Sequence, residues 1–491
     1  MGKETVMGYQ ILSVLAAVIA STACADLTSV NRNPNGPTDV EPPSILSNAI
    51  QTVVNGVDGP NNDLDIRGGG LWVQYYAEIQ YRDEDKYIVR PGVDGGWDFY
   101  NRGREDFQRM IDKGVAAGVP NWEAVGRIMK SYVFSVMTDA MGDIPYSEAF
   151  QGRALLTPKY DTQQAIYTAL FADLAKASQE IDIDPGAIGF ASGDIMYGGD
   201  MTEWRKFANS LRLRLAVHLS NVDAATAQSE AQAAVAAGVF ASNTDNAQLM
   251  YLASAPDQNP IYTNVHVDKR DDYGMSKTFV DSLLSWKDPR LPVFAQLNND
   301  TILANRTYQG LPNGLNDGVG PALFYISRIG AFWRETPAAP LALLTYSEVL
   351  FLEAEAAERG WISGSAATLY ADAIRASMEQ YGIATAAIDA YLAQPRVAYA
   401  GGAAGLTQIA YQKWLSLFTQ GPEGWTEVRR TGVPALVPGP NAVLPSIPER
   451  LPYADNEQVL NRANVDAAVA AQGFKSSTDL TTPLWFTGRQ P

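Results

Sequence analysis

The chain has 491 residues, 46% of them hydrophobic, and carries a net charge of −17 with only two histidines and one cysteine. The acidic balance disfavours nucleic acid as a partner, because its phosphate backbone would be repelled, and so few His and Cys residues disfavour a metalloenzyme or a His-based catalytic triad. Aromatic side chains are abundant, with 10 Trp, 23 Tyr and 16 Phe, and flat rings suit carbohydrate binding.

The first segment has the pattern of a secretion signal that ends at the single cysteine. Residues 11–20 are mostly apolar, and small residues at 21–23 lead directly to Cys24. The apolar run is too short to span a bilayer as a helix and is typical of a secretory signal. It resembles a bacterial lipobox, although Ser21 stands where such motifs usually have Leu. We expect a lipoprotein signal peptide at 1–23 and lipidation of Cys24, with ordinary cleavage near that point as the alternative.

The segment after the cysteine predicts a tether. Residues 24–45 are rich in Pro, Asn and Asp, which is typical of an irregular linker. Beyond it, from 46 to 491, we expect one folded domain. No later stretch approaches the ~18 uninterrupted apolar residues that a transmembrane helix needs.

Apolar residues at a spacing of three and four predict several amphipathic helices. Asp161 with Gln164, and Thr345 with Glu348, have the spacing of a capping box and predict two helix starts. The predicted helices cover 121–140, 161–181, 201–220, 345–360, 366–382 and 407–421.

Some of these helices are spaced as pairs. The helices within 345–382 have about the length of a TPR unit, and those within 121–181 have the spacing of a second pair. Because no fixed period of about 34 residues recurs, the pattern alone predicts helix pairs and leaves open whether they form a solenoid. The long segments between the helices are irregular, and long loops are often functional.

The stretch GGGLWVQYYAEIQYRDEDKY, which begins at residue 68, is the strongest candidate for a sugar site. Stacking rings beside acidic acceptors and an arginine donor are what a sugar requires. For Tyr75 and Tyr76 we favour burial in a helix, because their spacing is helical. The ligand-binding candidates in this stretch are Trp72, Tyr81, Arg82 and Asp83.

A second candidate segment precedes the helix pair at 345–382. Tyr325 and Trp333 lie in a predicted loop and would complete a pocket, although packing of Trp333 on the helix pair explains that residue equally well. For His218 we expect a satisfied core histidine. For Arg429 and Arg430, close to Trp425, we expect buried ion pairing or stacking.

Motifs for catalysis are missing from the sequence. It has no G-x-S-x-G elbow, no H-E-x-x-H and no P-loop. A glycosidase needs two carboxylates on opposite sides of the scissile bond, whereas the acidic candidates at 83–85 are adjacent. We therefore expect a binding protein and not an enzyme, with a glycoside hydrolase as the less favoured alternative.

Several blocks occur in a recognisable order between about residues 27 and 470. They include MGDIPYSEAF at 141–150, NSLRLR at 209–214, LTYSEVLFLEAEAAERGW at 344–361 and RRTG at 429–432. Together they resemble the SusD/RagB family of outer-membrane lipoproteins from Bacteroidetes-type bacteria. The resemblance implies a mainly α fold in which TPR-like helix pairs form a right-handed superhelical scaffold under an irregular, loop-rich ligand-binding face.

The same resemblance implies a role and further site residues. The family places ligand-binding aromatics and an Asn in an early loop, which favours Trp97 and Asn101. It implies a cell-surface lipoprotein, held at the outer membrane by its N-terminal lipid, that binds oligosaccharides and delivers them to a SusC-like TonB-dependent transporter. The same role with peptide cargo, as in the RagB branch, is the alternative. We expect no cofactor, and structural calcium among the acidic loops stays open.

Overall fold

Helices dominate the architecture of this chain. The computed structural model describes residues 40–57, 65–89 and 97–490, apart from the side chains of 66–67, 98 and 100–104. Within this part of the chain the strands are few and short, so the expected mainly α fold is confirmed. Cys24, the predicted signal peptide and most of the predicted tether lie outside the described residues.

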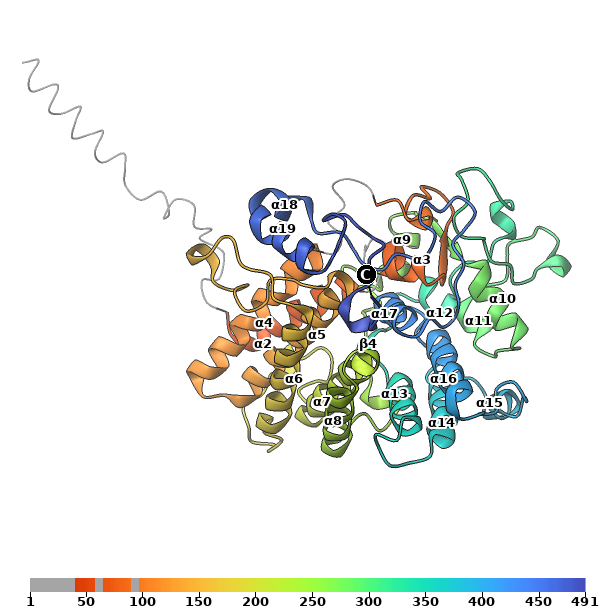
Figure 1. Cartoon of the computed structure of the whole chain (residues 1–491). Helices are drawn as coiled ribbons and strands as arrows, with labels where there is room; N and C mark the ends of the chain where they lie inside the picture. Colours follow the sequence, from red (N-terminus) through yellow and green to blue (C-terminus); the bar gives the residue numbers. More distant parts are fainter. Residues whose placement is uncertain (1–39, 58–64, 90–96, 491) are drawn as a thin grey trace, which may run out of the picture. The chain divides into compact units, whose positions relative to one another are not determined.

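The first half of the chain builds a row of helices in which each helix packs against the next. α2 packs on α4, α4 on α5, α5 on α6, α6 on α7 and α7 on α8. Figure 1 shows this row running from the left edge of the molecule to its lower middle. The helices span Pro42–Val57 (α2), Trp97–Ala117 (α4), Pro120–Met141 (α5), Gln163–Glu180 (α6), Met201–His218 (α7) and Ala224–Ala237 (α8).

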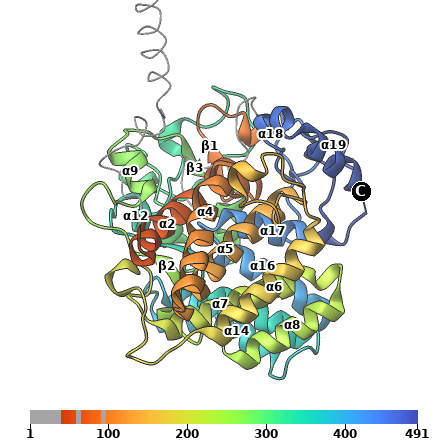
Figure 2. The ribbon, with the colours of Figure 1, turned by 90° about the vertical axis from the view of Figure 1, so that its left-hand side faces the viewer.

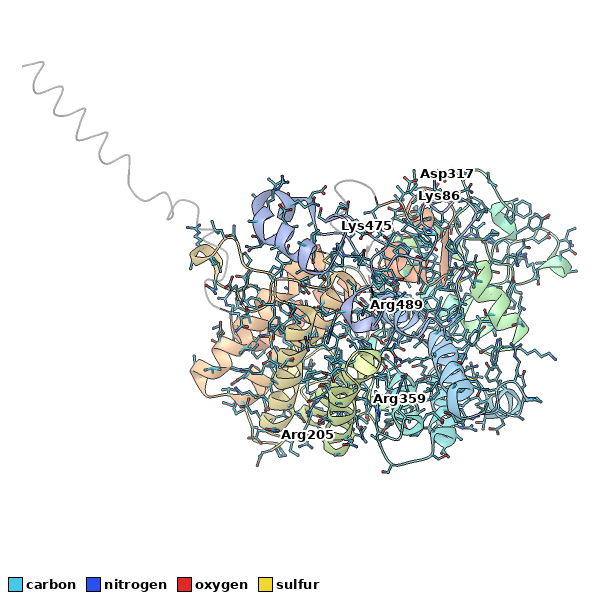
Figure 3. All side chains as sticks on the ribbon, viewed as in Figure 1. Lys86, Arg205, Asp317, Arg359, Lys475 and Arg489 are labelled. Atoms are coloured by element: carbon cyan, nitrogen blue, oxygen red, sulfur yellow. The ribbon has the colours of Figure 1, made fainter. Side chains whose placement is uncertain are left out.

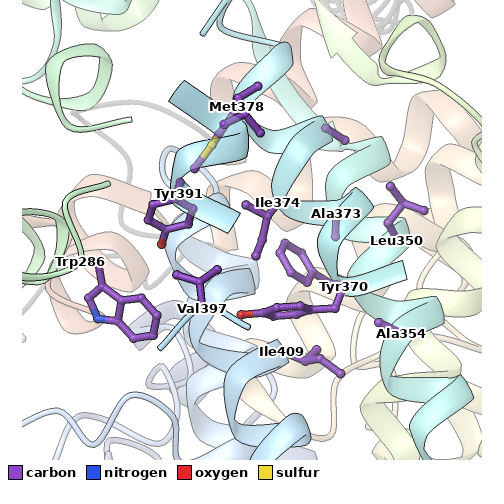
Figure 4. Close-up of a cluster of buried hydrophobic side chains, with 13 residues drawn as sticks. Trp286, Leu350, Ala354, Tyr370, Ala373, Ile374, Met378, Tyr391, Val397 and Ile409 are labelled. Carbon is purple, nitrogen blue, oxygen red and sulfur yellow. The ribbon is translucent and has the colours of Figure 1, made fainter. Parts of the chain in front are cut away.

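Helices from the second half extend the row. α13 packs on α7, α14 and α16, and α16 packs on α17. A hydrophobic core fills the space between α13, α14, α15 and α16, where Tyr370, Ile374 and Ile409 belong to one buried cluster (Figure 4). The helices span Tyr346–Glu358 (α13), Ala366–Glu379 (α14), Thr385–Leu392 (α15), Gly402–Ser416 (α16) and Gly421–Thr431 (α17).

Short helices and two small antiparallel sheets make up the loop-rich remainder. β1 (Tyr76–Glu78) pairs with β3 (Tyr273–Met275), and β2 (Ala247–Leu249) pairs with β4 (Leu341–Leu344). Figure 2 shows β1 and β3 toward the end of the body opposite α8 and α14. The short helices are Gly70–Trp72 (α3), Pro260–His266 (α9), Lys277–Ser285 (α10), Leu291–Phe294 (α11), Ala331–Arg334 (α12), Asp455–Leu460 (α18) and Arg462–Ala471 (α19).

The helices predicted from hydrophobic periodicity are all present, as α5, α6, α7, α13, α14 and α16. Both predicted helix pairs, α5 with α6 and α13 with α14, are in contact. A TPR-like superhelical course of these pairs stays a prediction.

One predicted helix start is wrong. Thr162 and not Asp161 caps α6, because the hydroxyl of Thr162 accepts the N–H of Ala165 at 3.2 Å. The carboxylate of Asp161 instead accepts the backbone N–H groups of Tyr146 at 3.1 Å and Ser147 at 2.7 Å. Asp161 therefore closes the loop before α6 and does not begin the helix.

Two other helix ends also differ from the pattern. α16 stops at Ser416 instead of continuing to 421, because Thr419 has a φ of +72°, which an α-helix does not accommodate. Thr345 caps α13 as predicted, with its hydroxyl 3.3 Å from the N–H of Glu348. The Glu348 side chain, predicted to complete the capping box, turns inward to the guanidinium of Arg214 at 2.6 Å.

Buried ion pairs join the helices in the middle of the row. Arg214 of α7 pairs with Glu348 of α13, and Arg430 of α17 pairs with Glu355 of α13 at 2.7 Å. Glu427 of α17 also contacts Arg430, at 2.7 Å. These side chains are almost fully buried, so the expectation of buried ion pairing at Arg430 is confirmed.

His218 belongs to the same network and is the satisfied core histidine that the sequence predicts. Its Nδ1 lies 3.1 Å from the carboxylate of Asp139, and its Nε2 lies 3.0 Å from that of Glu423. Burial alone would lower the pKa of His218, but the two carboxylates outweigh it and raise this pKa to about 9. The guanidinium of Arg429 stacks 3.6 Å from the ring centroid of Trp425, as expected.

Candidate ligand-binding face

The most exposed aromatic side chains of the described residues lie in the loop-rich part of the molecule. They are Tyr81, Phe324 and Tyr325, whose exposed fractions are 59%, 44% and 39%. The ring centroids of Phe324 and Tyr325 lie only 4.2 Å apart. The two rings are tilted by 48° to each other, and each exposed ring face is an apolar surface on which a sugar ring can stack.

A buried arginine braces the turn that carries Tyr81. The Nε of Arg82 donates to the carbonyl of Ile79 at 3.1 Å, and its Nη1 donates to the carbonyls of Asn316 at 2.8 Å and Val319 at 2.7 Å. The side chain thus ties two loops together that are more than 230 residues apart in sequence. Since Arg82 is buried and bonded to backbone, the prediction that it donates to a ligand does not fit this geometry, and we assign it a positioning role.

The backbone of this turn is held in an unusual conformation. Tyr81 has a φ of +58°, and Tyr87 just beyond it has a φ of +67°. Such values are uncommon for residues other than glycine and persist only where the surroundings impose them. Asp83, between these two residues, is half-buried and pairs with Lys86 at 3.3 Å. Lys86 and Asp317 are labelled close together at the top of Figure 3, above the helix row.

Backbone hydrogen bonds also hold the turn of Phe324 and Tyr325. The N–H of Asn299 donates to the carbonyl of Phe324 at 2.8 Å, and the amide Nδ2 of Asn298 donates to the carbonyl of Tyr325 at 3.3 Å. Arg328 reaches back to the carbonyl of Leu323 at 3.2 Å. These hydrogen bonds therefore hold in place the turn that carries the exposed rings of Phe324 and Tyr325.

The two turns share one support. Ile79, close to Tyr81, and Ile326, next to Tyr325, belong to the same small buried cluster. Gly274 of β3 lies between them, since a Cβ there would come within 2.7 Å of Ile326 and 3.7 Å of Ile79. A side chain at this position would push the supports of the two turns apart.

The charges beside this face are strongly paired. Asp271 lies 2.7 Å from the guanidinium of Arg328 and 3.1 Å from that of Arg334. Burial alone would raise the pKa of Asp271, but these two arginines outweigh it and hold the pKa below its usual range. His266 of α9 and Glu335 form a neighbouring pair at 2.8 Å.

The predicted tryptophans do not present ring faces to solvent. Trp72 packs edge-on against Trp425 with ring centroids 4.8 Å apart, and Trp97 lies edge-on to Tyr160 at 6.5 Å. Trp333 packs among aromatic neighbours in the core. Trp72, Trp97 and Trp333 are 2%, 3% and 1% exposed, so the expectation that they stack on a ligand does not fit this structure.

The other residues considered in the sequence analysis include Tyr75, Tyr76 and Asn101. Tyr75 and Tyr76 are fully buried, as favoured from their spacing. Asn101 belongs to α4, but its side chain lies outside the described residues. Phe324, which is exposed directly beside the predicted Tyr325, is not among the sequence predictions, because its neighbours Leu323 and Ile326 are also apolar and give no sign of exposure.

One group of side chains comes near the geometry of a metal site. The ligand atoms of His218, Glu423 and Glu427 lie within 4.8 Å of one another. Glu427 also pairs with Lys413 at 2.7 Å, and Arg214 lies 3.5 Å from Glu423. Because protein cations already face these carboxylates, the group is explained as part of the buried ion-pair network.

None of the helices in the described ranges combines the length and apolar character needed to cross a membrane.

The chain is similar to proteins of known structure over most of its length. A family model for SusD-like proteins, described as starch-binding and associating with the outer membrane, matches residues 34–454. A chitin-binding protein shares 30% identity at a TM-score of 0.80, with 91% of this chain and 100% of that chain covered. A search of the curated proteins finds no matching sequence.

Two further solved structures are similar at lower identity. A chitin-binding SusD homologue from Flavobacterium johnsoniae has 26% identity and a TM-score of 0.80, covering 91% of this chain and 99% of that chain. A SusD homologue from Bacteroides fragilis has 26% identity and a TM-score of 0.78, covering 92% of this chain and 100% of that chain.

Proposed function

Because the chain belongs to the SusD-like family, we propose that it binds oligosaccharides at the bacterial cell surface. In this proposal a lipid on Cys24 anchors it to the outer membrane, and it delivers its glycan to a SusC-like TonB-dependent transporter. The observation that supports glycan binding best is the set of exposed rings at Tyr81, Phe324 and Tyr325. They are the most exposed aromatic side chains of the described residues, and braced turns carry all three.

The chemistry of this face suits a neutral sugar chain. Each ring can cover the apolar face of one pyranose, while hydroxyls of the sugar meet polar groups such as Asp83 at the margin. Exposed stacking sites of this kind usually give affinities between micromolar and millimolar, about −4 to −8 kcal/mol. We expect chito-oligosaccharides to be strong candidates, since two similar solved proteins are chitin-binding.

Binding without cleavage is part of the proposal. Glu84 and Asp85, adjacent to the candidate Asp83, are buried. Asp85 accepts the N–H of Gly314 at 2.9 Å and a hydrogen bond from Asn313 at 2.6 Å, so it is used inside the fold. A pair of carboxylates that could flank a glycosidic bond is therefore not found at 83–85.

Affinity electrophoresis tests the proposal directly. The soluble chain from Ala25 would be run in native gels cast with soluble polysaccharides, and isothermal titration with chito-oligosaccharides would follow. We expect retardation by at least one glycan and its loss in the double variant Phe324→Ala, Tyr325→Ala. Leu156→Ala, which truncates another exposed apolar side chain, is the matched control. Absence of binding across a broad glycan panel would contradict the proposal and make peptides the next ligands to test.

A further inference from the structure

A pocket of about 300 Å³ is lined by residues other than the three exposed rings. It is bordered by the β2–β4 ribbon, by α12, by the end of α14 and by the link 417–420 between α16 and α17. Its apolar wall is aromatic: Tyr381 contacts Phe332 with ring centroids 5.4 Å apart and Trp333 at 5.6 Å. Trp333 is only 1% exposed and packs against this wall, so the half-buried rings of Phe332 and Tyr381 are the ones that a ligand can contact.

The polar side of the pocket consists of neutral groups. Its polar side chains are the amides Asn243, Asn246, Gln248, Gln380 and Gln420 and the hydroxyls Thr345 and Thr419. Among the described residues, no charged side chain lines it, although the chain carries a net charge of −17. A charged ligand would lose its hydration here without gaining an ionic partner, so this lining favours a neutral ligand.

Two buried acceptors in the lining lack a partner. Gln420 is 5% exposed, and its Oε1 is buried without a hydrogen bond from any residue that the structure describes. The Oδ1 of Asn243 is in the same state, while its Nδ2 donates to the carbonyl of Ala376 at 3.0 Å. A buried acceptor without a donor costs about 1–3 kcal/mol, so such groups need a reason in a folded protein.

The backbone beside these acceptors is strained. Thr419 precedes Gln420 and has a φ of +72°. Non-glycine residues in this conformation cluster at ligand sites, where the surrounding structure imposes them.

The amide oxygen of Asn246, in contrast to those of Gln420 and Asn243, has a partner, because its Oδ1 accepts the N–H of Tyr346 at 2.7 Å. The unused hydrogen-bonding capacity of the pocket is therefore centred on Gln420 and Asn243.

From these observations we infer that the pocket is a second glycan site, which holds one neutral pyranose unit between the aromatic wall and the amides of Gln420 and Asn243. An aromatic wall opposite neutral amides matches a ring that has an apolar face and hydroxyl groups at its edge. Both unpaired oxygens are covered in this structure, so a sugar hydroxyl donates to them once the two amide side chains turn into the pocket, whereas a carboxylated sugar finds no cation among the described lining residues. The unit is either a free monosaccharide or the end of a longer chain.

Titration of the soluble chain with matched sugars tests this inference. Glucose and N-acetylglucosamine are the neutral probes, glucuronic acid is the charged probe, and oligosaccharides of increasing length separate the free unit from a chain end. We expect saturable binding of a neutral probe and binding of glucuronic acid weakened about tenfold or more. In the double variant Phe324→Ala, Tyr325→Ala, which lacks the exposed ring pair, an affinity that rises with chain length assigns the pocket to a chain end, and a constant affinity assigns it to the free unit. No saturable binding of either neutral probe would overturn the inference.

Gln420→Leu separates a binding role from a structural one. The substitution removes an acceptor that has no partner in the described part of the chain and keeps a side chain of similar size. We expect affinity for the neutral probe to fall about tenfold, while thermal stability stays constant or rises, because an unsatisfied buried group is gone. Met250→Trp, at an exposed position of the lining, fills the pocket without touching the core and is expected to block binding too.

Gln420 also borders a cavity of about 20 Å³ beside His218, which has room for a single water. If such a water were its real partner, Gln420→Leu would lose stability and keep sugar binding, and this outcome would overturn the inference. The double variant Phe324→Ala, Tyr325→Ala is expected to bind the monosaccharide normally. If that variant no longer binds the monosaccharide, the monosaccharide site is at the exposed rings, and the pocket assignment is overturned. If the variant loses only the retardation by polysaccharides, the inference about the pocket is unaffected.

Discussion

Arg82 connects the turn of Tyr81 to the loop around Asn316 through three backbone carbonyls. In Arg82→Lys, a single ammonium replaces the planar guanidinium and cannot reach all three acceptors. We expect the free energy of unfolding to fall by about 1–2 kcal/mol and glycan retardation to weaken, because the Tyr81 ring loses its fixed position. Urea denaturation and affinity gels measure the two effects.

The control for this prediction is Arg153→Lys, which alters an exposed arginine on a different loop. One outcome would contradict the positioning role: Arg82→Lys lowers stability and leaves glycan retardation unchanged, whereas Tyr81→Ala abolishes retardation. The Tyr81 ring would then keep its position without the arginine.

Single residues were also where sequence reasoning succeeded least. The abundance of rings indicated a sugar-binding surface, but burial is the strongest tendency of a large apolar side chain. Trp72 is covered by Trp425, a residue about 350 positions away, and no local pattern contains that contact. The charges after Tyr81 and the predicted loop around Tyr325 single out these two residues, and both are exposed. Arg82 and Trp333 were identified as well, but as direct ligand residues, which their burial does not support.

At the scale of elements, the start of α6 offers a sharp test of the corrected cap. Thr162→Ala removes the acceptor of the Ala165 N–H and is expected to cost about 1 kcal/mol of stability. Asp161→Ala should instead release the N–H groups of Tyr146 and Ser147. Amide hydrogen exchange resolves the two sites: Thr162→Ala should accelerate exchange in the first turn of α6, and Asp161→Ala at 146–147.

The matched control is Thr168→Ala, which removes a hydroxyl on the exposed side of the same helix and should leave the first turn protected. Faster exchange at Ala165 in Asp161→Ala alone would show that the sequence-based assignment of the cap was right after all.

Elements were predicted well where the signal is local. A spacing of three and four over four or more turns located α5, α6, α7, α13, α14 and α16, because each helix must bury one face. The strands could not be found in this way. β2 and β4 are three and four residues long and lie about 90 residues apart, too short for an alternating pattern and paired only through the tertiary fold.

At the scale of the whole molecule, buried charges decide how the helices fit together. Arg430 of α17 contacts Glu355 of α13 and Glu427 of its own helix. Arg430→Ala leaves both carboxylates buried without this partner, so we expect a loss of about 3–5 kcal/mol in the free energy of unfolding. Denaturant titration measures it. Adding Glu355→Gln to Arg430→Ala should restore part of the loss, and a double variant as unstable as the sum of the single ones would contradict the ion-pair explanation.

The sequence predicts a buried ion pair at Arg430, but it could not reveal which carboxylates take part in this network. Glu348, Glu355 and Glu358 share one helix, and a row of glutamates on a helix is equally compatible with a packed or a solvated face. Glu348 faces Arg214, which is 134 residues away, and Glu355 faces Arg430, which is 75 residues away. Periodicity shows which positions share a face, but the charge opposite each position depends on how distant helices are assembled.

His218 makes the stability of this assembly depend on pH. Asp139, Glu423 and Glu427 face its ring, and its pKa is raised from an ordinary value of 6.5 to about 9. A raised pKa means that the folded state holds a proton which the unfolded state releases at lower pH. The stability from this group is therefore complete below its ordinary pKa and is lost as the pH rises through the folded value, at up to about 1.4 kcal/mol per pH unit between the two.

The measurement is the urea midpoint of the wild-type chain and of His218→Gln between about pH 7.5 and 8.5. Toward the upper end of this range, carboxyls such as Asp85 and Glu353, whose pKa values burial raises to about 7, are almost fully ionised and contribute little slope, so the comparison is made there. We expect the wild-type midpoint to fall with pH and the variant to be less stable at the lower pH but nearly flat. Parallel slopes in the two proteins would show that His218 does not hold its proton in the folded state, and the network would then be joined through a neutral ring that donates to one carboxylate only.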